Sequence, residues 1–236
     1  MQKQEQITRK VKRAGNGAHV FVPKGWAGEE VTLIRQPLPP VEERILNVLK
    51  HYLEGIVGIY LYGSYARGEA VKGSDVDILV ITNKKINIKE DNYEIVCLTE
   101  DEIEKAIKIS PVLIYSAMKE ARSIVNSKLL EELRKKHPIN EKYFKDYLKE
   151  TKRIIEINED LLDRYSIVLR LRGIFIIKQL LKEREYSHRE FKRWISKNSE
   201  VGGNDVLDKK KKLSEKELRS LLSLLKKSVT DLEGKL

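Results

Sequence analysis

Two aspartates, Asp75 and Asp77, stand one residue apart in the segment LYGSYARGEAVKGSDVDILV, soon after the step Gly63-Ser64. Alternate residues of a strand share one face, so both carboxylates should project in the same direction. Two like charges so close favour a cation between them, and oxygen-only ligands favour Mg²⁺. Gly63 would let the backbone approach a phosphate that Ser64 and the following N–H groups bind. The alternative is a pair of solvated carboxylates, with Ser64 as a simple helix cap.

The elements that must position this segment alternate between helix and strand. Apolar residues recur at helical spacing from Val41, and Thr99 with Glu102 forms a capping box that opens a later helix. Three apolar stretches have the length and composition of strands: 59–62, 76–81 and 93–98. A short edge strand is predicted near 123–125. Residues 41–137 are therefore expected to form an α/β domain with a mixed sheet, and the whole chain to be α+β.

Beyond Pro138 the pattern is helical throughout and predicts a helical, substrate-binding-like domain over 138–236. An apolar stripe runs from Tyr143 to Leu162, and further helices are predicted at 165–183, 188–197 and 215–232. The segment KNSEVGGNDVLDKKKK between the last two reads as a flexible, solvated loop. Three cations interrupt the apolar face of one helix, and they either face the cleft of the site and hold an anionic group, or reach the surface, or pair with Glu159 or Asp160. They are Arg170, Arg172 and Lys178.

The composition is that of a globular protein with basic ends. The 236 residues include 46 Lys and Arg against 36 Asp and Glu, a net charge of +10 that is concentrated before residue 41 and after residue 137. Basic flanks indicate either an anionic partner such as nucleic acid or a solvated surface. No apolar run reaches the ~18 residues of a membrane span. The single cysteine, Cys97, excludes an internal disulfide, so we expect a cytoplasmic protein whose metal ligands are carboxylates.

The glycine-serine step and the two aspartates form one pattern: Gly63-Ser64, ten intervening residues, then Asp75-Val76-Asp77. This pattern resembles the signature of the polymerase-beta-type nucleotidyltransferase superfamily, and the resemblance covers about residues 41–125. An ARG turn and a Ser-Asp step place the chain nearest to the small prokaryotic members, which include adenylylating antitoxins of the MNT type. The resemblance implies nucleotide binding by four residues: Gly63, Ser64, Arg67 and Ser74. For Arg67 the alternatives are a phosphate contact and a solvated surface position.

The resemblance also implies a third carboxylate on a neighbouring strand, where Glu94 stands in YEIVCL. Family members more often have Asp at this place, and the alternative for Glu94 is an exposed strand residue that faces water. Together Asp75, Asp77 and Glu94 would be the catalytic carboxylates of a two-metal Mg²⁺ site. Such a site would position and activate an acceptor oxygen for attack on the α-phosphate and stabilise the leaving pyrophosphate.

Residues 1–36 precede a run of three prolines within four positions and are predicted to form a small β unit, with strands at 19–22 and 31–34. The text KRAGNGAHVFVPKGWAGEEVTLI resembles the swapped-hairpin AbrB/MazE-like DNA-binding domains; the alternative is a β-extension that packs on the catalytic sheet. The resemblance implies a homodimer, which would supply the core that so short a unit lacks. It also implies nucleic-acid phosphate contacts from Lys10, Lys12, Arg13 and Lys24.

The expected function is Mg²⁺-dependent transfer of an NMP, with AMP from ATP as the leading case, to an acceptor hydroxyl with release of pyrophosphate. The rival interpretation is a DNA-binding regulator whose nucleotidyltransferase domain senses a nucleotide without turnover, and the complete carboxylate pair argues against it. The acceptor stays open between a protein, an RNA end and a small molecule, because the fold does not choose among them. The basic helical domain favours a macromolecule.

Overall fold

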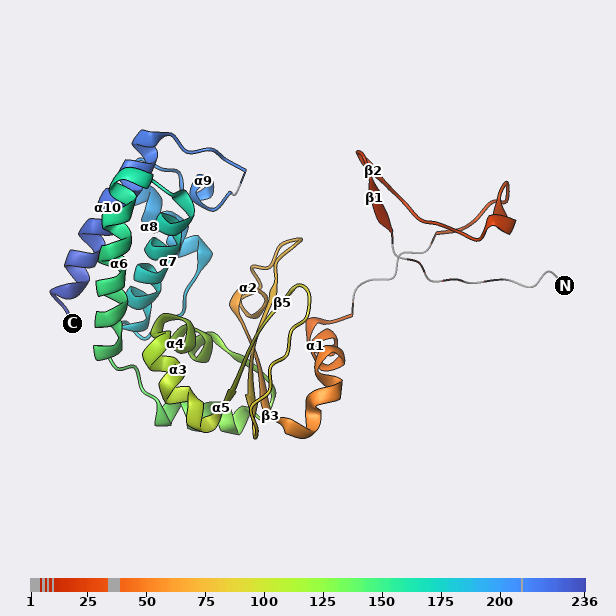
Figure 1. Ribbon diagram of the computed structural model, residues 1–236, viewed down its shortest axis with the longest axis horizontal. Helices are drawn as coiled ribbons and strands as arrows, with labels where there is room; N and C mark the ends of the chain where they lie inside the picture. Colours follow the sequence, from red (N-terminus) through yellow and green to blue (C-terminus); the bar gives the residue numbers. More distant parts are fainter. Residues whose placement is uncertain (1–4, 6, 8, 10, 34–38, 209) are drawn as a thin grey trace. The chain divides into compact units, whose positions relative to one another are not determined.

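The computed structural model describes residues 5, 7, 9, 11–33, 39–208 and 210–236 (Figure 1). The chain divides into two compact units, Met1–Pro39 and Pro40–Leu236. The fold is α+β, as the sequence predicts, with a small β hairpin in the first unit and a mixed sheet with many helices in the second.

A four-stranded mixed sheet forms the centre of the larger unit, in the strand order β5-β4-β3-β6. Strand β3 (Ile56–Tyr62) is antiparallel to both β4 (Val76–Thr82) and β6 (Arg122–Val125), whereas β5 (Tyr93–Thr99) runs parallel to β4. The three predicted apolar strands are confirmed. The predicted short strand is also confirmed, and it lies at the edge of the sheet.

Both faces of the sheet are covered, because apolar side chains alternate across β3 and β4. One face packs against α1 (Val41–Leu49), whose side chains Ile45 and Leu49 are fully buried. The opposite face carries Tyr60, Tyr62 and Leu79 into a second core. In Figure 1, α1 lies on one side of the sheet and α3 (Ile103–Ile109) and α4 (Pro111–Glu120) lie on the other.

Short elements connect these strands and helices. The 3₁₀ helix η2 (Lys50–Gly55) leads into β3, and α2 (Gly63–Ala66) follows it directly. The predicted capping box of Thr99 and Glu102 is confirmed at η3 (Glu100–Glu102), which continues into α3. After β6, α5 (Ser127–Lys136) is capped by the Asn126 side chain, which accepts a hydrogen bond from the Leu129 backbone N–H at 3.1 Å.

The second half of the large unit is a helical bundle. It consists of α6 (Lys142–Leu161), α7 (Arg164–Leu180), α8 (His188–Asn198), α9 (Gly203–Leu207) and α10 (Glu215–Glu233). The prediction of one flexible loop between α8 and α10 was wrong, since that segment contains α9. Val201 and Val206 are buried there, and a side chain on Gly203 would begin only 2.2 Å from the backbone oxygen of Lys192, so glycine permits the close packing.

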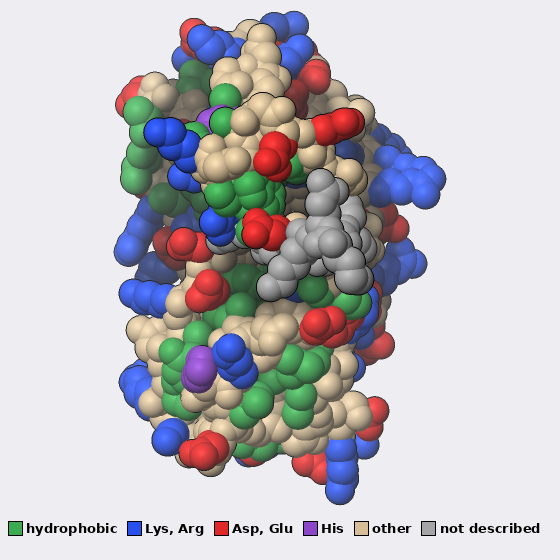
Figure 2. All heavy atoms as spheres, turned by 90° about the vertical axis from the view of Figure 1, so that its right-hand side faces the viewer, with side chains coloured by type: hydrophobic (Ala, Val, Ile, Leu, Met, Phe, Trp, Pro, Cys, Tyr) green, Lys and Arg blue, Asp and Glu red, His purple; other side chains and the backbone are tan. Residues whose placement is uncertain are grey.

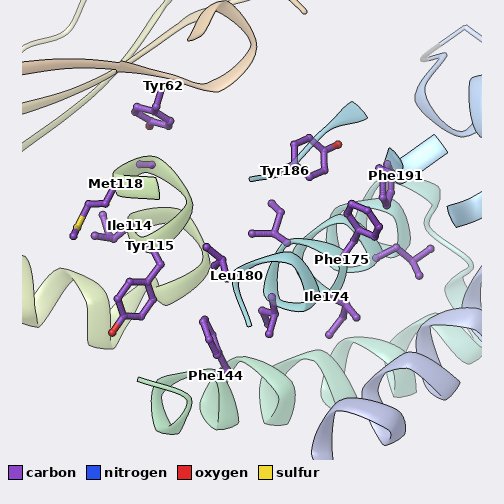
Figure 3. Close-up of a cluster of buried hydrophobic side chains, with 14 of the residues drawn as sticks. Tyr62, Ile114, Tyr115, Met118, Phe144, Ile174, Phe175, Leu180, Tyr186 and Phe191 are labelled. Atoms are coloured by element: carbon purple, nitrogen blue, oxygen red, sulfur yellow. The ribbon is translucent and has the colours of Figure 1, made fainter. Parts of the chain in front are cut away.

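One continuous core joins the sheet to the bundle. Figure 3 shows Tyr62 of β3 above Met118 and Tyr115 of α4, with Phe144 of α6 and Leu180 of α7 completing the cluster. The rings of Tyr115 and Phe144 meet edge to face, with 5.9 Å between their centroids. Burial of side chains from all these elements explains why residues 40–236 form one compact unit.

Residues 11–33 of the small unit show no comparable core. Strands β1 (Lys12–Ala14) and β2 (Gly17–His19) form a hairpin about Gly15 and Asn16, followed by η1 (Lys24–Trp26). The strands predicted at 19–22 and 31–34 were wrong within the described residues, where 20–22 and 31–33 are irregular. None of the residues from 11 to 33 whose exposure is described is buried, so their alternating pattern has no core to pack against.

No helix in the described parts of the chain is both long enough and apolar enough to cross a membrane.

We expect Leu148→Ala to lower the free energy of unfolding by about 2–5 kcal/mol, because it leaves a cavity in the core beneath α6. Leu148 is 1% exposed, whereas Leu161 on the same helix is 67% exposed and provides a matched control. Leu161→Ala should change stability by less than about 0.5 kcal/mol. Urea unfolding of both variants measures the difference, and equal losses would contradict the packing described for α6.

Candidate functional site

Asp77 lies near the start of β4, between the two neighbouring strands that carry Tyr62 and Glu94. Its register partner on β3 is Tyr62 and its register partner on β5 is Glu94. Paired residues of parallel strands share a face of the sheet, so Asp77 and Glu94 lie side by side on the face that looks toward the bundle core. The structure thus brings together two of the three predicted metal ligands.

Gly63 makes the close packing of Asp77 possible. It follows β3 directly and has a φ of +71°, a backbone conformation that side chains disfavour. A Cβ atom at this position would lie 1.8 Å from the Asp77 Oδ2 atom. The backbone N–H of the next residue, Ser64, donates a hydrogen bond to the Asp77 carboxylate. The predicted Gly-Ser step therefore packs directly against the predicted metal ligand.

The electrostatics of Asp77 favour a bound cation. Burial and the negative charge of Glu94 raise the pKa of Asp77 to about 6, against the opposing effects of the Ser64 N–H and of the positive charges of Arg172 and Arg67. The ionised carboxylate is therefore destabilised in the free protein. A divalent cation between Asp77 and Glu94 would offset both the burial and the repulsion.

The carboxylates that the protein offers here suit Mg²⁺ only if ligands from outside the protein complete the coordination shell of the ion. Asp75 stands immediately before β4 and is exposed, as is Glu94, whereas Asp77 is half-buried. Among the described residues, no three carboxylate, imidazole or thiol side chains are gathered closely enough to hold a metal ion. Mg²⁺ commonly uses one or two protein carboxylates together with water and substrate phosphates. The oxygen ligands of Asp77 and Glu94 fit that arrangement.

The remaining residues predicted to bind a nucleotide lie in the turn that follows β3. Ser64 is half-buried in α2 beside Asp77. Ser74 lies farther along, where its hydroxyl accepts a hydrogen bond from the Val71 backbone N–H at 3.0 Å and closes the turn before β4. Ser74 thus stabilises the turn that precedes Asp75 and Asp77 in this structure.

Arg67 is not a solvated surface residue. Its side chain is 11% exposed, its Nε donates a hydrogen bond to Glu69 Oε2 at 2.8 Å, and its guanidinium also pairs with Glu120. Glu120 ends α4 and is itself buried, with its other oxygen accepting a hydrogen bond from the Ser116 hydroxyl at 2.6 Å. Arg67 therefore joins the turn after β3 to α4.

The bundle contributes one cation to the surroundings of Asp77. Arg172 of α7 is exposed, lies over the ring of Tyr186 at 5.6 Å from its centroid, and lowers the pKa of Asp77 by its charge. The other two cations of this helix have different partners: Arg170 pairs with Glu150 at 2.8 Å, and Lys178 lies over Trp194 at 5.4 Å.

The partners considered for these cations in the sequence analysis were wrong. Glu159 pairs with Lys226 at 2.7 Å, on the far helix α10. Burial also lowers the pKa of Lys178, in keeping with its place against an aromatic ring.

Two tyrosines near the site were not identified from the sequence. Tyr62 is 5% exposed and Tyr186 is 4% exposed, and neither hydroxyl has a hydrogen-bond partner within the described structure. Burial, together with the charges of Asp77, Glu94 and Glu120, raises the pKa of Tyr62. Tyr62 could have been noticed because it directly precedes Gly63. No local sequence signal points to Tyr186, which lies in the connection between α7 and α8.

The residues predicted to contact nucleic acid lie in the small unit. Lys10 is outside the described residues, and so is the side chain of Arg13, whereas Lys12 in β1 and Lys24 in η1 are exposed. Figure 2 shows Lys and Arg side chains interspersed with Asp and Glu on the face it draws, without one continuous basic patch.

Comparison with known proteins gives a family match and several similar chains. Residues 43–133 match the family model described as Polymerase beta, Nucleotidyltransferase. Two putative protein adenylyltransferases of Methanocaldococcus jannaschii are similar in sequence, with 34% identity over 83 residues and 32% over 75. These alignments cover 31% and 32% of this chain, and 56% and 73% of the relatives. The chain thus spans little more than half of the first relative.

A solved structure is similar over most of the larger unit. It is a spectinomycin adenyltransferase from Enterococcus faecialis, crystallised with ATP and spectinomycin, with a TM-score of 0.54 and 14% sequence identity. The similarity covers 80% of this chain and 97% of that one. At this identity it shows a shared fold alone. The family match begins at residue 43, so it does not confirm the resemblance of residues 1–36 to AbrB/MazE-like domains.

We expect Gly63→Ala to destabilise the protein by several kcal/mol and to abolish stabilisation by Mg²⁺, because the new methyl group displaces Asp77. Gly68→Ala is the matched control: Gly68 has a φ of +68°, and a Cβ there would meet no atom within 4 Å. The control should lower the free energy of unfolding by only about 1–3 kcal/mol, the cost of holding a non-glycine residue at a positive φ. Thermal unfolding with and without Mg²⁺ measures both effects, and identical behaviour of the two variants would contradict the site geometry.

Proposed function

Because the chain belongs to the polymerase beta nucleotidyltransferase family, we propose that it transfers AMP from ATP to an acceptor hydroxyl and releases pyrophosphate in a Mg²⁺-dependent reaction. One observation carries the proposal: the carboxylate of Asp77 is packed against the Gly63-Ser64 turn and lies beside Glu94. In the proposal, these carboxylate oxygens would bind the metal ion beside the backbone that would receive a triphosphate.

In the proposed site, Asp77 and Glu94 hold Mg²⁺, with exposed Asp75 joining them when substrate binds. Mg²⁺ at this position would offset the negative charge that develops on the phosphates. Gly63 lets the triphosphate approach the backbone, and the hydroxyl of Ser64 binds its oxygens. Glu94 is exposed, so it can also receive the proton of the incoming acceptor hydroxyl.

Arg172 is the bundle residue that we assign to the triphosphate. It is exposed, its charge acts on Asp77, and no ion pair holds it in the part of the chain that the structure describes. Its neighbour Arg170, by contrast, is already paired with Glu150. A cation that has no ion pair among the described residues, and whose charge acts on Asp77, suits a polyanion such as ATP.

The acceptor that we propose is a hydroxyl side chain of a protein. Support comes from the curated relatives, both named as putative protein adenylyltransferases. The basic helical half of the chain agrees with a macromolecular partner. Use of ATP also agrees with the cytoplasmic location expected from the sequence.

The test is incubation of purified protein with Mg²⁺, α-labelled ATP and cell extract, followed by a denaturing gel. Label that migrates with protein supports the proposal, label on RNA or on small molecules redirects the acceptor, and the absence of any transfer refutes the enzyme.

We expect Asp77→Asn to lower label transfer at least a thousandfold, since a loss of about 4 kcal/mol of charge stabilisation corresponds to that factor. The metal-free variant should unfold at an equal or higher temperature than the wild type, because the substitution removes repulsion from Glu94. Asp160→Asn, at an exposed position of α6, is the control and should retain full activity. Near-normal transfer by Asp77→Asn would refute the assignment of the site.

A second role, nucleic-acid binding by a homodimer through residues 1–36, is favoured by the exposed small unit. Its apolar side chains Phe21 and Leu33 are 68% and 72% exposed, and the cations Lys12 and Lys24 are exposed as well. A unit below about 40 residues seldom has enough core to fold alone and is commonly stabilised by association. The exposed apolar residues would bury against a second copy, and the cations would remain available for phosphates.

Deletion of residues 1–36 should leave transfer to the acceptor intact and weaken binding to DNA or RNA. Each neutralised phosphate contributes a slope of about −0.9 to log affinity against log salt on B-DNA, so the loss of four contacts should flatten the slope by about three to four units. Fluorescence anisotropy over a salt series measures this change. An unchanged slope would show that the nucleic-acid contacts, if present, lie elsewhere.

A further inference from the structure

A single carboxylate, that of Glu69, connects the turn after β3 with the start of α8. Its Oε1 accepts hydrogen bonds from the His188 backbone N–H at 3.0 Å and from the Ser187 hydroxyl at 3.4 Å. Its Oε2 accepts the hydrogen bond from Arg67 Nε and lies 3.4 Å from His188 Nδ1. Ser187 and His188 lie 118 and 119 positions after Glu69 in the chain.

The backbone of Glu69 is also hydrogen-bonded to the backbone of the site. Its own N–H donates a hydrogen bond to the Ser64 carbonyl at 2.9 Å, while the Arg67 N–H donates to the Gly63 carbonyl at 3.2 Å. The turn that carries Gly63 and Ser64 is therefore closed through Glu69. Any shift of Glu69 would move the backbone that packs against Asp77.

The Glu69 carboxylate is held in its charged form. Burial tends to raise its pKa, but the hydrogen bond and charge of Arg67, together with His188, bring the pKa below its usual range. It lies at the N-terminus of α8, where a negative charge is favoured and where free backbone N–H groups need acceptors. Glu69 therefore forms an ion pair with Arg67 and, through the His188 N–H, a second cap on α8 beside the Ser187 cap.

The residue before this cap, Tyr186, supports Arg172. The guanidinium groups of Arg67 and Arg172 lie over its ring, at 5.0 Å and 5.6 Å from the centroid. The ring is fixed from the bundle side by edge-to-face contact with Phe175, at 6.0 Å between centroids. Glu69 thus fixes the segment that continues from Tyr186, and Tyr186 in turn orients Arg172.

From these contacts we infer that Glu69 is a positioning residue, which aligns the triphosphate-binding turn of Gly63 and Ser64 with Arg172 of the bundle. The inference rests on the proposed function, because it assigns Arg172 to the triphosphate. Glu69 does not touch the substrate and acts through the two parts of the site that it connects. A misplacement of about 1 Å in such a site can cost on the order of a hundredfold.

Glu69→Gln tests the inference, because the amide keeps the size of the side chain and an acceptor oxygen but removes the charge that holds Arg67 and His188. Calorimetric titration with Mg²⁺ and ATP should show affinity ten- to a hundredfold weaker than that of the wild type. The control is Glu131→Gln on α5, an exposed glutamate outside this cluster, which should bind ATP normally. Equal affinities of the two variants would overturn the inference.

A double-mutant cycle with Arg172→Ala separates positioning from general stability. If Glu69 acts through Arg172, Glu69→Gln should weaken ATP binding much less in the Arg172→Ala background than in the wild type. Additive losses, or full ATP affinity in Arg172→Ala alone, would overturn the inference. Should Glu69→Gln fail to fold, Glu69→Asp keeps the charge but withdraws it from α8, and it should show the same non-additivity.

The readout also separates this inference from the proposed function. Transfer of label tests the enzyme, whereas ATP affinity tests Glu69. If the wild-type protein binds ATP without transferring label, AMP transfer is refuted. The double-mutant cycle would then still decide whether Glu69 is a positioning residue. A wild-type protein that binds no ATP would refute both.

Discussion

The contact between Asp77 and the Gly63-Ser64 turn is the constraint on which the rest of the site depends. A half-buried carboxylate beside a second one is unfavourable, and its pKa of about 6 records that cost. The fold maintains the arrangement because β4 is held between β3 and β5 and because glycine leaves no Cβ to collide with the carboxylate. The same features that make the free site unfavourable are the ones on which the proposed binding of a cation and a polyanion rests.

The helical bundle packs against the part of the chain that carries this site and forms one compact unit with it. The core under Tyr62 continues through Tyr115 and Phe144 into α7, so the sheet and the bundle pack as one body. Charged side chains add to this packing: Glu69 joins the turn after β3 to α8 of the bundle, and Arg67 joins the same turn to α4 beside the sheet. The apolar contacts supply the stability, whereas the charged contacts are directional and set the alignment.

The small unit differs from the large one in kind. Its hairpin satisfies local backbone hydrogen bonds but buries none of the described side chains from 11 to 33 whose exposure is known. Hydrophobic alternation was enough to suggest strands there, yet within residues 11–33 the structure has strands only at 12–14 and 17–19. Alternation specifies a strand only where one face has a core to cover. The strands β3, β4 and β5 were predicted from continuous apolar stretches, and they form because cores cover both faces of the sheet.

The sequence alone determined the elements and residues whose signals are local: the strands of the sheet, the Gly63-Ser64 step, the pair Asp75 and Asp77, and the capping box at Thr99. Spacing on a strand fixes which side chains share a face, as for Asp75 and Asp77, whereas Glu94 was expected only from the family resemblance and its pairing with Asp77 came from the sheet register. Only the tertiary structure decided that Arg172 lies over the ring of Tyr186, that Arg67 is paired with Glu69 and Glu120, and that Glu69 caps α8. Those contacts join residues far apart in the chain, and no periodicity or motif encodes which distant partner a charged side chain will meet.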